Sequence, residues 1–119
     1  MSLGPVAFII FGGAGDLTWR KLIPSLFTLH LNGSLPDKFA IIGVDHAALS
    51  DATLRKRLHD GVRRFSNLGP IKSGNWKAFA AHISYEGGDF ASARTYTNLA
   101  KKLTALDKAW NAKPVRIFH

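Results

Sequence analysis

The sequence has no cysteine among its 119 residues. This absence excludes a disulfide framework, a thiolate nucleophile and any metal site built from cysteine, and it is compatible with a reducing cytoplasm. No apolar run reaches the roughly 18 to 20 residues that a membrane-spanning helix needs. Residues 1–5 lack the basic leader of a signal peptide. We therefore expect a cytoplasmic protein with no membrane partner.

Acidic residues are also scarce: Asp and Glu number 8 against 16 Lys and Arg, a formal net charge of +8. Such a balance is typical of proteins that bind nucleic acid. The basic clusters at residues 55–57, 63–64 and 101–102 fall on predicted helices, however, and solvated helix faces explain them more simply. A basic nucleic-acid-binding module stays open as an alternative, as does a longer parent whose further acidic residues balance the charge.

The hydrophobic content of 46% describes a soluble globular chain, and the length fits one domain. Apolar strands are predicted at 5–11, 39–44, 82–85 and 115–119, and helices at 17–32, 51–65, 76–81 and 91–110. Strands that alternate with helices favour right-handed crossovers and a parallel sheet. The fold class is thus α/β, a doubly wound and mostly parallel sheet of about four strands.

Helical spacing and end signals predict which faces are buried. We expect Ser50 to cap the helix at 51–65, Gly33 to end the helix at 17–32, and Pro24 to kink that helix or to open its first turn. The predicted apolar stripes are Leu22, Leu26 and Leu29 with Trp19 or Ile23; Leu54, Leu58, Val62 and Phe65; and Tyr96, Leu99, Leu103, Leu106 and Trp110.

A glycine-rich turn joins the first strand to the first helix, and it is the most informative stretch of the chain. Gly12 lets the strand end in a tight turn, Gly15 leaves room for a phosphate beside the backbone, and Ala14 is small. The start of the next helix presents unpaired N–H groups and a positive dipole. Thr18 stands where the usual fingerprint has a third glycine. This layout is typical of a Rossmann-like site for a dinucleotide.

The residues around this turn carry a family resemblance. Gly12-Gly13-Ala14-Gly15-Asp16-Leu17, Arg20-Lys21-Leu22 with Pro24, Asn32-Gly33, Leu35-Pro36 and residues 39–43 resemble the amino-terminal region of glucose-6-phosphate dehydrogenase, and the likeness continues weakly to residues 116–118. The resemblance implies that residues 1–119 are the dinucleotide-binding domain at the amino-terminal end of a longer, homo-oligomeric dehydrogenase that oxidises glucose 6-phosphate and reduces NADP or NAD in the pentose phosphate pathway. Members are about four times longer.

The resemblance also assigns cofactor-binding residues. The pyrophosphate falls to Gly12, Gly13, Ala14, Gly15, Asp16, Leu17 and Thr18, with Lys21 directed at the cleft. Asp45 and His46 would hold the adenosine ribose, and Asp89 and Phe90 would lie near the adenine. His46 stands where NADP-using members have an arginine. Because a carboxylate at Asp45 repels a 2′-phosphate, the local chemistry favours NAD or weak discrimination.

No catalytic or metal-binding residue is predicted. The five histidines are scattered and lack the spacing of a zinc site. A base for the sugar hydroxyl and a sugar-phosphate pocket, which hydride transfer requires, are not found, so the chain alone is expected to bind nucleotide and to be inactive. A short-chain reductase or epimerase domain is a second reading, although Asp16-Leu17-Thr18 and Arg20-Lys21-Leu22 argue against it.

Overall fold

The computed structural model describes residues 4–12, 15, 18–47, 49–66, 68–112 and 114–119, with only the backbone of residues 18 and 19. Its centre is a sheet of four strands in the order β3-β2-β1-β4, and every neighbouring pair is parallel. The strands are β1 (Val6–Phe11), β2 (Phe39–Asp45), β3 (Ile83–Gly87) and β4 (Val115–Phe118). The predicted α/β class and parallel sheet are confirmed.

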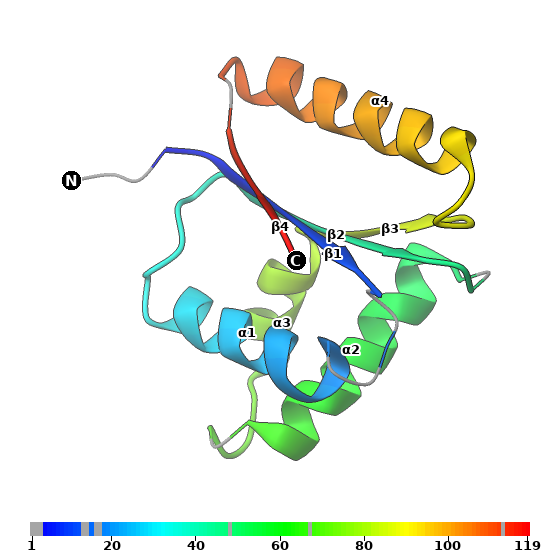
Figure 1. The fold of residues 1–119 in the computed structure, drawn as a ribbon. Helices are drawn as coiled ribbons and strands as arrows, with labels where there is room; N and C mark the ends of the chain where they lie inside the picture. The colour runs from blue at the N-terminus through cyan, green and yellow to red at the C-terminus, as the bar shows by residue number, and fades with distance from the viewer. Residues whose placement is uncertain (1–3, 13–14, 16–17, 48, 67, 113) are drawn as a thin grey trace.

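Helices cover both faces of this sheet. They are η1, a π-helix (Thr18–Leu22), and the α-helices α1 (Ile23–Leu31), α2 (Asp51–Phe65), α3 (Ser73–Ala80) and α4 (Ala93–Trp110). Figure 1 shows α1, α2 and α3 below the sheet and α4 above it, so the sheet is doubly wound as predicted. The crossover through α4 carries the chain from β3 at one edge to β4 at the other.

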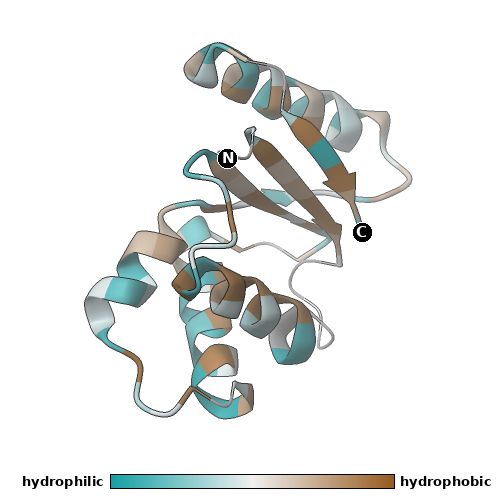
Figure 2. Ribbon diagram, turned by 90° about the vertical axis from the view of Figure 1, so that its left-hand side faces the viewer, coloured by the Kyte–Doolittle hydropathy of each residue, from teal (hydrophilic) through white to brown (hydrophobic). Residues whose placement is uncertain are grey.

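Each face of the sheet has its own core. The larger core packs α1, α2 and α3 against one face, with Phe27, Phe79, Leu54 and Leu58 among its buried side chains. The smaller core packs Leu99 and Leu103 of α4 against alternate residues of β1 and β2. Every residue of β2 is buried, as a central strand covered on both faces requires. Figure 2 shows the two central strands mostly in brown, the hydrophobic end of the scale.

The first helical segment follows its predicted stripe only in part. The structure buries Ile23 and Phe27, whereas Leu22 and Leu26 are partly buried and Leu29 is 41% exposed. Ile23 is the predicted alternative that the structure buries, and the side chain of the other, Trp19, lies outside the described residues. Pro24 occupies the first turn of α1, one of the two predicted outcomes.

Local end signals hold where they were predicted. The Ser50 side chain accepts a hydrogen bond from the Thr53 amide and starts α2 at Asp51. Gly33 has a φ of +70°, and its amide and that of Ser34 return to the carbonyls of His30 and Leu29, the Schellman arrangement.

Two predicted stripe residues of the later helices α2 and α4 are also wrong. Phe65 is 40% exposed because it is the last residue of α2, where the Arg20 guanidinium lies 5.5 Å from its ring centroid. Tyr96 is 46% exposed and contacts the ring of Phe11 at the end of β1 instead of entering the core of α4.

Element boundaries differ by up to three residues from the prediction. α3 starts at Ser73 and α4 starts at Ala93, where predicted helices began at 76 and 91.

Within the described part of the chain, none of the helices combines the length and the apolar character that crossing a bilayer would demand.

Candidate functional site: the carboxyl edge of the sheet

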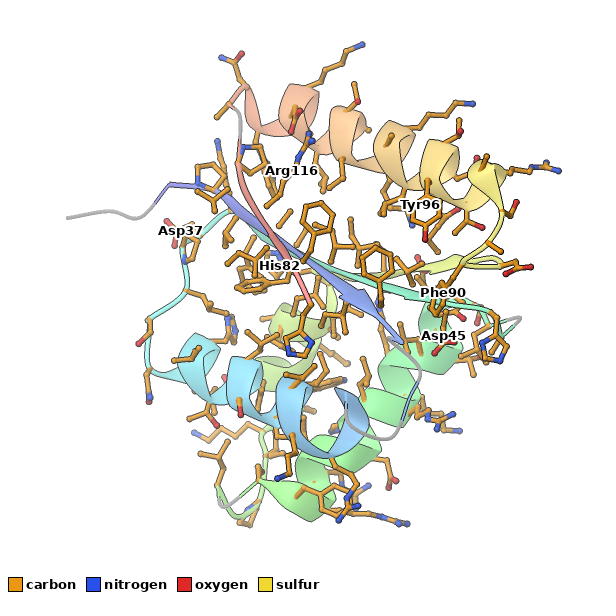
Figure 3. The ribbon with its side chains drawn as sticks, viewed as in Figure 1. Asp37, Asp45, His82, Phe90, Tyr96 and Arg116 are labelled. Atoms are coloured by element: carbon orange, nitrogen blue, oxygen red, sulfur yellow. The ribbon has the colours of Figure 1, made fainter. Side chains whose placement is uncertain are left out.

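The carboxyl ends of β1, β2 and β3 bring Gly12, Asp45 and residues 88–90 to one edge of the sheet. The strand order reverses direction beside β1, since β2 and β3 lie on one side of it and β4 on the other. In open α/β sheets this switch point forms the crevice where ligands bind. In Figure 3, Asp45 and Phe90 lie at this edge and Asp37 lies at the opposite one.

The chain leaves β1 in a tight turn at Gly12, as the sequence predicts. Gly12 has a φ of +78°, a conformation that side-chain-bearing residues rarely adopt. Its amide donates to the carbonyl of Val44 across 2.7 Å, which attaches the turn to the end of β2. The Gly15 amide donates to the Gly12 carbonyl across 2.8 Å, and a β-carbon on Gly15 would stand 3.0 Å from that oxygen. A side chain is therefore unfavourable at Gly12 because of its backbone conformation, and at Gly15 because its β-carbon would crowd the Gly12 carbonyl.

A helix begins immediately after this turn. The backbone is helical from Thr18, where the π-helix begins. Leu22, the last residue of the π-helix, has α-helical angles and continues into α1. The predicted residue Lys21 lies in this π-helix and is exposed. The predicted contacts of Gly13, Ala14, Asp16 and Leu17 lie outside the described residues, as does the side chain of Thr18.

Asp45 ends β2 at the same edge, and its carboxylate is shielded from solvent. Only 7% of the residue is exposed, and its Oδ1 accepts the His46 amide across 2.8 Å. The same oxygen lies 2.9 Å from Nδ1 of His46, whose side chain is 82% exposed. The carboxylate thus has a fixed position, with an imidazole beside it at the surface.

The segment after β3 supplies the last two predicted residues. Asp89 is exposed, and its Oδ1 accepts the Ala91 amide across 2.9 Å while its carbonyl accepts the Thr95 hydroxyl across 2.8 Å. Phe90 is 40% exposed, and its ring meets the Phe11 ring edge-on with centroids 6.0 Å apart. Phe90 is therefore not a core residue, and it offers an aromatic surface beside β1.

β3 also supports the turn at residues 45–47, which sequence reasoning missed. The Tyr85 hydroxyl donates to the Ala47 carbonyl across 2.6 Å, and the Tyr85 amide donates to Oδ1 of Asp51 across 2.8 Å. Burial raises the pKa of the Tyr85 phenol, and the negative charge of Asp45 raises it further. Alternating burial in β3 was the available signal, since a buried tyrosine hydroxyl needs a partner.

Parts of the basic clusters have structural partners. Arg55 donates from Nε and Nη2 to the Ile83 carbonyl, and Lys102 donates to the Tyr85 carbonyl and pairs with Glu86 at 3.5 Å. Arg64 pairs with Asp60 one turn earlier on α2. Over the described ranges, no cluster of three or more His, Asp or Glu side chains could hold a metal ion.

Comparison with known proteins decides the family. A family profile described as "Glucose-6-phosphate dehydrogenase, NAD binding domain" matches residues 9–119. The chain belongs to this family. The matched range contains the glycine turn, the carboxyl end of β2 and the segment after β3.

Relatives of this NAD-binding domain are longer proteins. The chain is 30% identical over 115 residues to the glucose-6-phosphate 1-dehydrogenase of Chlamydia muridarum. The matched region covers 97% of this chain and 23% of that protein. It is 33% identical over 109 residues to the enzyme of that name from Leuconostoc mesenteroides, covering 92% of this chain and 22% of that protein. The chain thus spans under a quarter of the length of these relatives.

Solved structures agree with the domain's fold. A glucose-6-phosphate dehydrogenase in complex with its substrate glucose-6-phosphate superposes with a TM-score of 0.84 at 28% identity, over 99% of this chain and 25% of that chain. The enzyme of Mycobacterium avium, at 21% identity and a TM-score of 0.78, shows the same fold. The predicted resemblance is confirmed, and the reading as a short-chain reductase or epimerase domain is set aside.

Proposed function

We propose that this NAD-binding domain holds a nicotinamide dinucleotide across the carboxyl edge of its sheet, in the order pyrophosphate, ribose and adenine from β1 to β3. The observation that carries the proposal is the turn at Gly12 and Gly15, in which the Gly12 amide bonds to the Val44 carbonyl and a β-carbon on Gly15 would stand 3.0 Å from the Gly12 carbonyl. A turn without side chains before a helix start lets phosphate oxygens approach the N–H groups of the first helical turn.

Each predicted residue has a role in this proposal. We assign the pyrophosphate to Gly12, Gly15 and the helix start at Thr18, together with residues 13–14 and 16–17, and we expect Lys21 to add a positive charge near it. The Asp45 carboxylate accepts hydrogen bonds from the adenosine ribose, a role that an acid at the end of the second strand plays in Rossmann folds. His46, Asp89 and Phe90 border the ribose and the adenine.

In the longer protein, we propose that the reaction is that of glucose-6-phosphate dehydrogenase, the oxidation of the sugar at C1 to 6-phosphogluconolactone. The nicotinamide, when bound, supplies the hydride acceptor. The domain's own residues bind and orient the dinucleotide, and we assign the base and the sugar-phosphate pocket to other parts of the enzyme. The extent of the domain over residues 1–119 and homo-oligomeric assembly stay predictions. A cytoplasmic location also stays a prediction, and a relative from Nicotiana tabacum is named chloroplastic.

A binding map tests the proposal. NAD titrated into the ¹⁵N-labelled chain should shift amide resonances of Gly12, Gly15, residues 45–47 and residues 88–90, and should leave the exposed basic face of α2 unchanged. Glucose 6-phosphate alone should shift none of them. Shifts confined to Lys56, Arg57 and Arg63 would contradict the proposal. Duplex DNA binding at physiological salt without nucleotide would instead support the nucleic-acid alternative.

A further inference from the structure

We propose that Tyr85 is a positioning residue that fixes the turn at residues 45–47 and thereby sets the preference between NAD and NADP. The inference rests on the proposed function, because it concerns the same ribose site. Tyr85 lies beneath that site, in the middle of β3, and only 6% of it is exposed. It would act through the turn and would not itself contact the dinucleotide.

The geometry of Tyr85 joins three elements at one point. Its hydroxyl donates to the carbonyl of Ala47 across 2.6 Å, a contact between residues 38 apart in sequence. Its amide donates to the carboxylate of Asp51, the first residue of α2, across 2.8 Å. The turn between β2 and α2 is therefore held to β3 by the side chain of Tyr85 and by its backbone.

The glycines that follow Tyr85 let the turn lie close to β3. A β-carbon on Gly87 would stand 3.3 Å from the carbonyl oxygen of Ala47, tighter than ordinary van der Waals contact. The Gly88 amide donates to the carbonyl of Asp45 across 2.9 Å. The turn is thus held at two of its residues. The Asp45 carbonyl accepts the amide of Gly88, just after β3, and the Ala47 carbonyl accepts the hydroxyl of Tyr85.

The ionisation of Tyr85 suits this role. Burial and the nearby Asp45 charge both raise the pKa of its phenol, so the hydroxyl keeps its proton and remains a donor throughout the neutral range. The acceptor is a backbone carbonyl, which does not titrate. The hydrogen bond therefore holds the turn equally well across the pH range in which a dehydrogenase would be assayed.

A fixed turn matters because Asp45 discriminates by position. A carboxylate held beside the ribose accepts hydrogen bonds from its hydroxyls and repels a 2′-phosphate, whereas a carboxylate free to move away does neither well. The Asp45 carboxylate is bound to the next residue of the turn through the His46 amide. Loss of the Tyr85 hydroxyl would release that turn at Ala47 and weaken the discrimination.

The test compares Tyr85→Phe with Tyr96→Phe, which removes the same atom from a tyrosine that is 46% exposed on α4. Dissociation constants for NAD and NADP are measured by calorimetry on the whole chain at one salt concentration. Tyr85→Phe should raise the NAD constant about 3-fold to 10-fold, the range expected for one lost hydrogen bond. The NADP constant should change less than about 2-fold, and Tyr96→Phe should change neither.

The outcomes separate the inference from the proposed function. Wild-type chain that binds no dinucleotide would overturn both. NAD binding that Tyr85→Phe leaves unchanged, or equal losses for NAD and NADP, would overturn the inference alone, since equal losses indicate a merely structural role. If Tyr85→Phe fails to fold, Asp51→Asn gives the second test: it weakens the bond from the Tyr85 amide and should move the NAD to NADP ratio in the same direction.

Discussion

The amide of Gly12 donates a hydrogen bond to the carbonyl of Val44 across 2.7 Å, so the turn that leaves β1 is attached to the end of β2. Gly12 directly follows β1, and Val44 lies in β2, the neighbouring parallel strand, whose carboxyl end is at the same edge. This bond holds the turn that we assign to the pyrophosphate next to Asp45, which we assign to the ribose. The spacing of the two subsites therefore depends on the backbone of Gly12.

Replacing Gly12 with alanine should cost about 1 to 2 kcal/mol of stability, because its φ is unfavourable for a side-chain-bearing residue. The variant should also weaken NAD binding. Gly69→Ala is the matched control. Gly69 has a φ of +70°, and an added β-carbon there has no neighbour within 4 Å, as at Gly12. Gly69 lies in the loop between α2 and α3. Urea denaturation should show similar losses for both variants, and calorimetry should show weaker NAD binding for Gly12→Ala only. Equal NAD affinity in the two variants would contradict the assignment.

Neutralising Asp45 should shift cofactor preference toward NADP. Asp45→Asn removes the charge that repels a 2′-phosphate and weakens the hydrogen bonds to the ribose hydroxyls. Hydrogen bonds to charged groups contribute about 1 kcal/mol more than neutral ones, so the ratio of NAD to NADP affinity should fall about tenfold. Asp37→Asn makes the same change in net charge at the opposite edge of the sheet and should leave the ratio unchanged. A wild-type chain that strongly prefers NADP would also count against this role.

A side chain at Gly88 should disrupt the start of α4. An added β-carbon would stand 3.1 Å from Cβ of Thr95 and closer still to its hydroxyl, which donates to the Asp89 carbonyl. Overpacking of this kind costs about 1 to 3 kcal/mol, so Gly88→Ala should lower the melting temperature. Thr95→Ala should recover part of that loss when the two changes are combined. Gly74→Ala, at an exposed position of α3 with nothing within 4 Å, should be neutral or stabilising. A simple sum of the two single effects in the double variant would argue against the close contact.

Acid should destabilise the fold through His30. Burial lowers the pKa of His30 below its usual 6.5, and the positive charge of His82 lowers it further. In the window below 6.5 and above the folded pKa, the unfolded chain binds a proton that the folded chain does not. Stability is therefore complete above pH 6.5 and falls as pH drops below it.

His30→Phe keeps an aromatic ring among Phe27, Phe39 and Phe79 and removes the titration. Melting curves between pH 7.5 and 5.5 should show a smaller drop for this variant than for the wild type. Some drop should persist, because burial and then Arg63 also lower the pKa of His59. Identical pH slopes in the two proteins would show that His30 is not a source of the acid sensitivity.

Local signals in the sequence predicted the parts of the fold that local chemistry controls. The serine at position 50 and the glycine at position 33 specify helix ends through hydrogen bonds that span at most five residues, and both predictions hold. The apolar strands were equally clear. The buried face of α1 was predicted only in part, because the apolar residues at 22, 23, 26 and 27 fit either of two neighbouring helix faces and packing against the sheet decides between them.

The hydrogen bond from Tyr85 that holds the turn at residues 45–47 could not be predicted, because it joins residues far apart in sequence. The Tyr85 hydroxyl and the Ala47 carbonyl lie 38 residues apart, and they meet only because β2 and β3 pair in one register. The surroundings of Phe90 could not be predicted either, since its contact with Phe11 depends on where the α4 crossover begins. The sequence placed the candidate residues at strand ends, and tertiary packing decides which of them share the edge.

The most direct test of the account is a calorimetric titration of NAD into the wild-type chain and into Gly15→Asp. The added side chain would crowd the Gly12 carbonyl, 3.0 Å from the new β-carbon, and would place a negative charge beside the pyrophosphate. Gly74→Asp, with the same charge change at an open position of α3, is the control. We predict one NAD per chain for wild type and Gly74→Asp and no measurable binding for Gly15→Asp, with far-ultraviolet circular dichroism alike in all three. Equal NAD affinity in the three proteins would contradict the account.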